Sequence, residues 1–175
     1  DRYLQLFGGS PLGGGSVSAK GSGPAMTVRL SVCGKQTDPD GNTQENPALY
    51  TAACVPSGDG WLFSYEADGV PARLFLSRRL AWTERSEEEA QDTPGNRMVF
   101  DPSVPAAKCL YETPFGTIPM EIRTRRIALL GKGAAAAPEG HAGNTFRLRA
   151  RIFYTLQMDP GYELSCTVTI RADST

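Results

Sequence analysis

Apolar and polar residues alternate almost without a break through the last third of the chain. Apolar side chains occupy every second position of residues 146–156, and the same spacing returns over residues 164–170. These positions are Phe146, Leu148, Ala150, Ile152, Tyr154 and Leu156, then Leu164, Cys166, Val168 and Ile170. A two-residue period is typical of a strand that has one dry face and one wet face. The pattern therefore predicts two long, half-buried strands.

The same reading of the whole chain predicts about ten strands and almost no helix. The expected strands are residues 27–33, 48–55, 61–66, 70–76, 79–86, 97–100, 108–113, 117–129, 145–158 and 162–172. Turn sequences separate them, such as D-P-D-G-N at residues 38–42 and D-P-G at residues 159–161. Closure removes exposed sheet edges, so we expect an all-β fold: a single closed or nearly closed antiparallel up-and-down β-barrel of about 8–10 strands.

The first 25 residues differ from the rest, because Gly, Ser and Pro supply 13 of them. This composition predicts a leader over residues 1–25, either added to the native chain or reflecting a mis-called start, followed by a barrel domain over residues 26–173. If the leader is ordered, its apolar residues should dock on this barrel or on a second copy, so a homodimer stays open. Those residues are Tyr3, Leu4, Leu6 and Phe7.

Length and charge narrow the classes of function. A chain of 175 residues suits one domain. Its 18 Lys and Arg against 19 Asp and Glu give a formal net charge of -1, so no overall field attracts the protein to nucleic acid or to an anionic membrane. No apolar run reaches about 18 residues, and no secretion signal is visible. We therefore expect a cytoplasmic protein without a membrane partner.

Several motifs resemble a known family. They are F-S-Y-E at residues 63–66, R-M-V-F at residues 97–100 and Y-E-T-P-F-G-T-I-P-M-E-I-R-T-R-R-I at residues 111–127, followed by a long strand that contains Tyr154. Over residues 27–172 the chain resembles the YwiB-like family, small bacterial proteins of unknown function. The resemblance implies a calycin-type barrel, related in shape to lipocalins. It implies no catalytic residues.

The residues themselves show no catalytic constellation. The single histidine, His141, lies in a Gly/Ala-rich segment with no nucleophile motif nearby. The cysteines lack the C-x-x-C spacing of a metal or redox site, so we expect free thiols and no metal; they are Cys33, Cys54, Cys109 and Cys166. Carboxylate pairs such as Glu66 with Asp68 are usually solvated. We expect a non-enzymatic protein without a cofactor.

The barrel interior is the first candidate binding site. A barrel of about eight strands is wide enough to fill itself with side chains or to hold one small ligand. Aromatic rings and tyrosine hydroxyls would suit an apolar or amphipathic ligand. The residues expected to line the interior are Trp61, Phe63, Tyr65, Tyr111, Met120 and Tyr154. A ligand pocket and a packed core are both consistent with this set.

The outer wall is the second candidate. Arginines recur at the polar positions of two strands that should be neighbours, so their guanidiniums could form a ladder that grips phosphate or carboxylate groups. They are Arg123, Arg125, Arg147, Arg149 and Arg151, with Arg126 beside them. A solvated wall without a partner is the plainer alternative. As a site, this face would make a protein or nucleic-acid interaction module, although the net charge argues against nucleic acid.

Overall fold

The computed structural model describes residues 25–85, 97–113, 116–132, 146–159 and 161–175, with the backbone alone at residues 110–113, 117, 132 and 159. Every regular element in these ranges is a strand, so the all-β prediction is confirmed. Nothing in them forms a helix long and apolar enough to cross a bilayer. The predicted leader, apart from Ala25, lies outside the described residues.

All ten predicted strands are present. They are β1 (Met26–Thr37), β2 (Thr43–Ser57), β3 (Gly60–Ala67), β4 (Val70–Leu76), β5 (Ala81–Arg85), β6 (Arg97–Phe100), β7 (Ala107–Thr113), β8 (Gly116–Lys132), β9 (Arg147–Asp159) and β10 (Tyr162–Ser174). The largest difference is the β1–β2 hairpin, whose ladder continues until Thr37 pairs with Thr43. Its outer part is polar on both faces and therefore carries no alternation signal, yet the backbone pairing continues.

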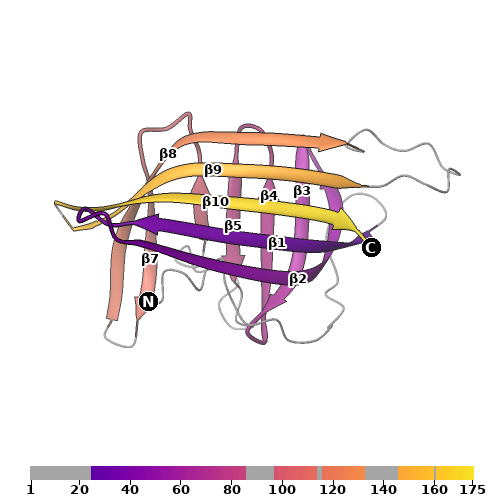
Figure 1. Ribbon diagram of the computed structural model, residues 1–175, viewed down its shortest axis with the longest axis horizontal. Helices are drawn as coiled ribbons and strands as arrows, with labels where there is room; N and C mark the ends of the chain where they lie inside the picture. Colours follow the sequence, from indigo (N-terminus) through magenta and orange to yellow (C-terminus); the bar gives the residue numbers. More distant parts are fainter. Residues whose placement is uncertain (1–24, 86–96, 114–115, 133–145, 160) are drawn as a thin grey trace, which may run out of the picture.

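The strands follow one another around a single sheet (Figure 1). Their order is β6-β5-β4-β3-β2-β1-β10-β9-β8-β7, and neighbouring strands pair antiparallel throughout. The last strand returns to pair with the first, while β6 and β7 form the two ends of the sheet. The predicted up-and-down barrel is thus confirmed as a nearly closed one, with a seam between β6 and β7.

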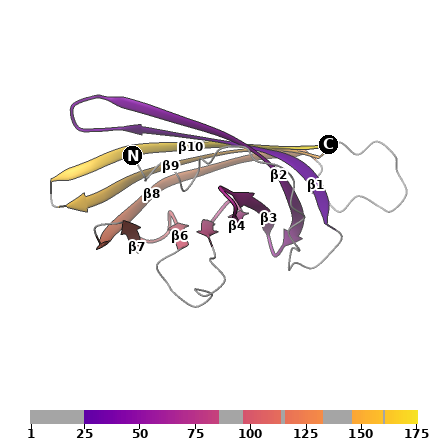
Figure 2. The same cartoon turned by 90° about the horizontal axis from the view of Figure 1, so that it is seen from below.

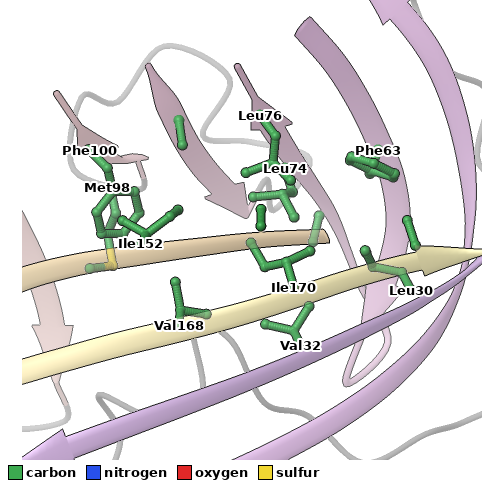
Figure 3. Packing of buried hydrophobic residues seen from close by; sticks show 14 of the residues in the cluster. Leu30, Val32, Phe63, Leu74, Leu76, Met98, Phe100, Ile152, Val168 and Ile170 are labelled. Atoms are coloured by element: carbon green, nitrogen blue, oxygen red, sulfur yellow. The ribbon is translucent and has the colours of Figure 1, made fainter. Parts of the chain in front are cut away.

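The barrel has a long wall and a short wall. Strands β1, β2, β8, β9 and β10 arch over the shorter strands β3 to β7 (Figure 2), and the two sets run in crossing directions (Figure 1). The core lies between the walls. Val32, Val168 and Ile170 of the long wall belong to the same core cluster as Leu74 and Leu76 of the short wall (Figure 3).

The predicted alternation describes the core correctly. Every apolar position that it marked in β9 and β10, together with Phe146 just before β9, is buried. The side chains between them are half-buried or exposed, and Arg151 and Ser165 are among the exposed ones. Full burial of one aliphatic side chain stabilises a fold by about 1.5–3 kcal/mol, so this inward face supplies much of the driving force.

Neighbouring residues of β9 should therefore differ sharply in their effect on stability. We expect Ile152→Ala to lower the free energy of unfolding by about 2–5 kcal/mol, because Ile152 is fully buried. The exposed neighbour gives a matched control, and Arg151→Ala should change that free energy by less than about 0.5 kcal/mol. Urea denaturation followed by circular dichroism measures both. Equal losses in the two variants would contradict the assigned faces of β9.

Candidate functional site

The predicted interior residues are packed into the core. The five with described side chains, Trp61, Phe63, Tyr65, Met120 and Tyr154, are all buried. Their rings contact other rings: Trp61 meets Phe146 at 5.0 Å between centroids, and Tyr154 meets Phe100 at 4.8 Å. The side chain of Tyr111 lies outside the described residues. The described members of this set therefore belong to the packed core, where their rings contact other rings.

One charged side chain faces the interior where none was predicted. Arg85 of β5 pairs with the buried Ala72, which places it on the inner face. Its Nε and Nη2 atoms are buried and have no hydrogen-bond partner among the described residues, which stop at Arg85 and resume at Arg97. Burial raises the pKa of the Tyr65 hydroxyl above its usual range, and the charge of Arg85 lowers it in part. Arg85 is thus an inward cation with unused donors.

The end of the barrel contains a pocket of about 440 Å³, here called the end pocket. Turns and strand ends supply its lining, which consists of Asp59, Trp61, Arg78, Arg79, Leu129, Gly131 and Leu148. Trp61 and the two leucines make an apolar wall, while the two arginines are exposed at the rim. The volume lies within the range of about 300–1,000 Å³ typical of small-molecule sites. Of the predicted interior residues, Trp61 is the one that contributes to it.

A buried serine fixes the turn that carries the two rim arginines. The Ser77 hydroxyl accepts hydrogen bonds from the backbone N–H of Arg79 at 3.3 Å and of Leu80 at 3.0 Å, and it donates to the Leu80 carbonyl at 2.9 Å. The backbone N–H of Ser77 also donates to that carbonyl. This turn, predicted as the start of a strand, instead ends before Ala81. It holds the backbone of Arg78 and Arg79 beside Trp61.

The predicted arginines lie on the outer side of the long wall, and other cations extend the group. Register places Arg171 of β10 opposite Arg149 of β9, and Arg29 of β1 opposite Asp173 of β10. We call this surface the basic face and define it as Arg29, Lys35, Arg123, Arg125, Arg126, Arg147, Arg149, Arg151 and Arg171. Local alternation could not show that β10 and β1 are neighbours, so their contribution was missed.

Acidic groups neutralise the basic face only in part. The described outward acids of β8, β9, β10 and β1 are Glu121, Glu163 and Asp173. Asp173 Oδ1 lies 3.5 Å from Arg147 Nε and 3.1 Å from Arg149 Nη2, although neither contact has hydrogen-bond geometry. Within the described ranges, Arg29, Arg151 and Arg171 make no ion pair.

Two arginines of the short wall, Arg73 and Arg97, contact both an acid and an aromatic ring. Glu84 pairs with Arg73, and its second oxygen lies 3.6 Å from Arg97. Both guanidiniums also lie over the Trp82 ring, with their central carbons 5.5 and 4.3 Å from its centroid. Arg73 and Arg97 therefore have partners within the fold. On the basic face, Arg123 lies 3.4 Å from Glu121, while Arg29, Arg151 and Arg171 make no ion pair among the described residues.

A β-bulge brings two consecutive arginines onto the basic face. Thr124 pairs with Tyr154 and Arg126 pairs with Phe153, so Arg125 is the extra residue. Both arginines are exposed, and their guanidinium carbons lie 5.5 and 5.4 Å from the Phe153 ring centroid. Strict alternation would turn one of two adjacent side chains inward. The bulge is why Arg126 joins Arg125 on one face.

The four cysteines are free thiols, and three of them are buried. No disulfide links them, and burial raises the pKa of Cys54 and Cys166 to about 12 and that of Cys109 to about 11. A thiol with such a pKa is almost fully protonated at neutral pH and is a weak nucleophile. The described residues contain no group of three His, Cys, Asp or Glu side chains that could hold a metal ion. His141 falls outside them.

Comparisons with known proteins show a likeness of fold. No protein-family model matches the chain, and no curated protein matches its sequence. Among solved structures, the crystal structure of ywiB protein from Bacillus subtilis is similar, with a TM-score of 0.56 and 18% sequence identity. The match covers 83% of this chain and 91% of that chain. The YwiB-like fold predicted from the motifs is therefore confirmed.

Thiol labelling should separate one cysteine from the other three. Cys33 is partly exposed on β1, so we expect a disulfide reagent to modify about one thiol per folded chain rapidly at pH 8, and the rest only after unfolding. The free energy of unfolding should also fall as pH rises from about 9 towards 12, because the buried thiols ionise in the unfolded chain first. Rapid labelling of Cys54 or Cys166 in folded protein would contradict their burial.

Proposed function

We propose that the protein is a non-enzymatic binding barrel whose ligand is a small amphipathic anion, held in the end pocket. The observation that carries this proposal is the pairing, in one pocket of about 440 Å³, of a tryptophan and two leucines with two arginines. An apolar body would pack on Trp61, Leu129 and Leu148. The anionic group would bind Arg78 and Arg79.

The chemistry of the lining supports this class of ligand. A guanidinium presents donors in a planar fork that matches a carboxylate or a phosphate, and hydrogen bonds to such anions are stronger than neutral ones. Asp59 is the one acid among the described lining residues, so the two arginines give this part of the lining a positive charge. The turn fixed by Ser77 holds the backbone of both arginines in place before any ligand arrives. A preorganised site loses less entropy on binding.

The end pocket replaces the centre of the barrel as the proposed ligand site. A ligand at the centre would have to separate ring contacts such as Tyr50 with Tyr65, whose centroids are 4.6 Å apart. Closely packed interiors resist such a change because each lost contact forfeits dispersion energy. A ligand in the end pocket needs no such displacement.

The proposal includes a family and a compartment. We place the chain in the YwiB-like family of calycin-type barrels, supported by the motif at residues 111–127 together with the likeness of fold. The free cysteines support a reducing compartment such as the cytoplasm, where thiols are kept reduced.

A second candidate function is binding through the basic face. The whole chain has a formal net charge of -1, yet this one surface gathers nine cations, those that define the basic face. The acids on the same strands are Glu121, Glu163 and Asp173, and Glu45 of β2 lies opposite Lys35. Such a concentration creates a local positive potential that attracts a polyanion despite the overall charge. The surface is continuous over four neighbouring strands, which suits an extended partner better than a single ion.

Fluorescence of a bound probe tests the end pocket. The chain has two tryptophans, so Trp82→Phe leaves Trp61 as the only one. Anilinonaphthalene sulfonate, an aromatic anion, should then accept energy from Trp61, and hexanoate should displace it. In that background, Arg79→Gln should weaken binding of the probe about tenfold, since a hydrogen bond to a charged group contributes about 1.5–3 kcal/mol.

Two controls keep this test specific. Arg97→Gln removes the same charge from the short wall and should leave affinity for the probe unchanged. Near-ultraviolet circular dichroism confirms that each variant keeps native packing. If neutral hexanol displaced the probe as well as hexanoate does, or if Arg79→Gln bound it normally, the proposed anion site would be wrong.

Retention on immobilised heparin tests the basic face. Arg171→Gln should lower the salt concentration at which the protein elutes. Each lost contact with the polyanion reduces the number of counterions that binding releases, and so weakens binding. Arg97→Gln removes one charge elsewhere and should elute with the unaltered protein. No retention of the unaltered protein at low salt, or identical shifts in both variants, would remove the support for this second function.

A further inference from the structure

We propose that the bulge in β8 builds a binding site for single-stranded nucleic acid around Phe153. Arg125 and Arg126 would bind a phosphate, and the ring would support a base. Nucleic-acid binding here presupposes that the basic face is a binding surface, the second function proposed for the protein.

The first support is the bulge itself. Thr124 faces the core and is buried, Ile127 packs against the core, and both Arg125 and Arg126 between them are exposed. A bulge disrupts the ladder locally, and bulges recur where a side chain must be re-aimed. Here the gain is a pair of adjacent guanidiniums on one side of the sheet, which regular pairing cannot provide.

The second support is the position of Phe153. It lies on the solvent side of β9, between the inward Ile152 and Tyr154, so the barrel core does not use it. Its ring is half-buried, and both arginine carbons lie within about 6 Å of it, the range of a cation–π contact. An aromatic ring among guanidiniums on an outer face is a platform on which a base can stack.

The surroundings of the ring are basic or neutral. Its register partners are Arg126 on β8 and Thr167 on β10, and Lys35 of β1 lies opposite Thr167. Along β9, Arg151 is the next outward residue on one side. Alternate residues of a strand are about 7 Å apart, so several phosphates of one extended chain can meet cations in succession. None of these neighbours is acidic.

Single-stranded nucleic acid uses all of these features. A free phosphate ion would bind the arginines but has no flat group that could stack on the ring. An acidic peptide supplies carboxylates but no regular series of flat groups. A duplex keeps its bases stacked on one another, whereas a single strand presents both phosphates and unstacked bases. The site therefore points to a single strand.

Fluorescence anisotropy of labelled oligo(dT), titrated with the full chain over a series of salt concentrations, tests the site. We expect binding that weakens with salt. Phe153→Leu should lower affinity about tenfold, in line with the cost of losing one stacked base, and should leave the salt dependence unchanged. Phe153→Tyr keeps a ring and should bind as the unaltered protein does. Arg126→Gln should lower affinity and reduce the slope of log affinity against log salt by about 0.7.

The outcomes distinguish the site from the surface that carries it. Arg97→Gln serves as the charge control and should bind normally, and urea denaturation checks that Phe153→Leu is folded. Retention on heparin without binding to oligo(dT) would overturn the nucleic-acid site and leave the basic face standing. Failure to bind either polyanion would overturn both. If Phe153→Leu and Phe153→Tyr both bound like the unaltered protein, the ring would have no role and the proposed site would be wrong.

Discussion

The ladder between β1 and β10 joins the two ends of the described chain, and its register sets both faces of the long wall. Leu30 and Val32 lie opposite Ala172 and Ile170 in the core, while Ser31 lies opposite Arg171 outside. A shift of one residue would turn the core side chains to solvent and bring the arginine inward. Burial of apolar surface therefore holds this register, and the basic face is a consequence of the same constraint.

Local patterns predicted the strands well, because alternation and turn residues are local information. They failed where an interaction spans the chain or breaks the period. Arg171 and Arg29 meet only through the β10–β1 ladder, and Arg126 faces outward only because of the bulge. The inward Arg85 follows Ala81 and Thr83 on the inner face of β5, where two polar residues hide the alternation. The end pocket depends on turns brought together by closure, which no local pattern describes.

Some of the outward arginines lie where their like charges lower the stability of the fold. Arg149 and Arg171 are cross-strand partners, and like charges in that position are destabilising. Asp173 offsets this locally, but exposed ion pairs contribute only about 0–1 kcal/mol. On the short wall, Glu84 and Trp82 are partners of two arginines, Arg73 and Arg97.

The seam between β6 and β7 gives the barrel one weak line. Elsewhere a ladder of backbone hydrogen bonds links each strand to the next, whereas no such ladder joins β6 to β7 in the described residues; packing contacts such as that of Phe100 with Tyr154 help to close the barrel on this side. Local opening is cheapest where few backbone hydrogen bonds must break. Transient local opening of the barrel should therefore occur at this seam, where water can enter the interior while β1 and β10 remain paired.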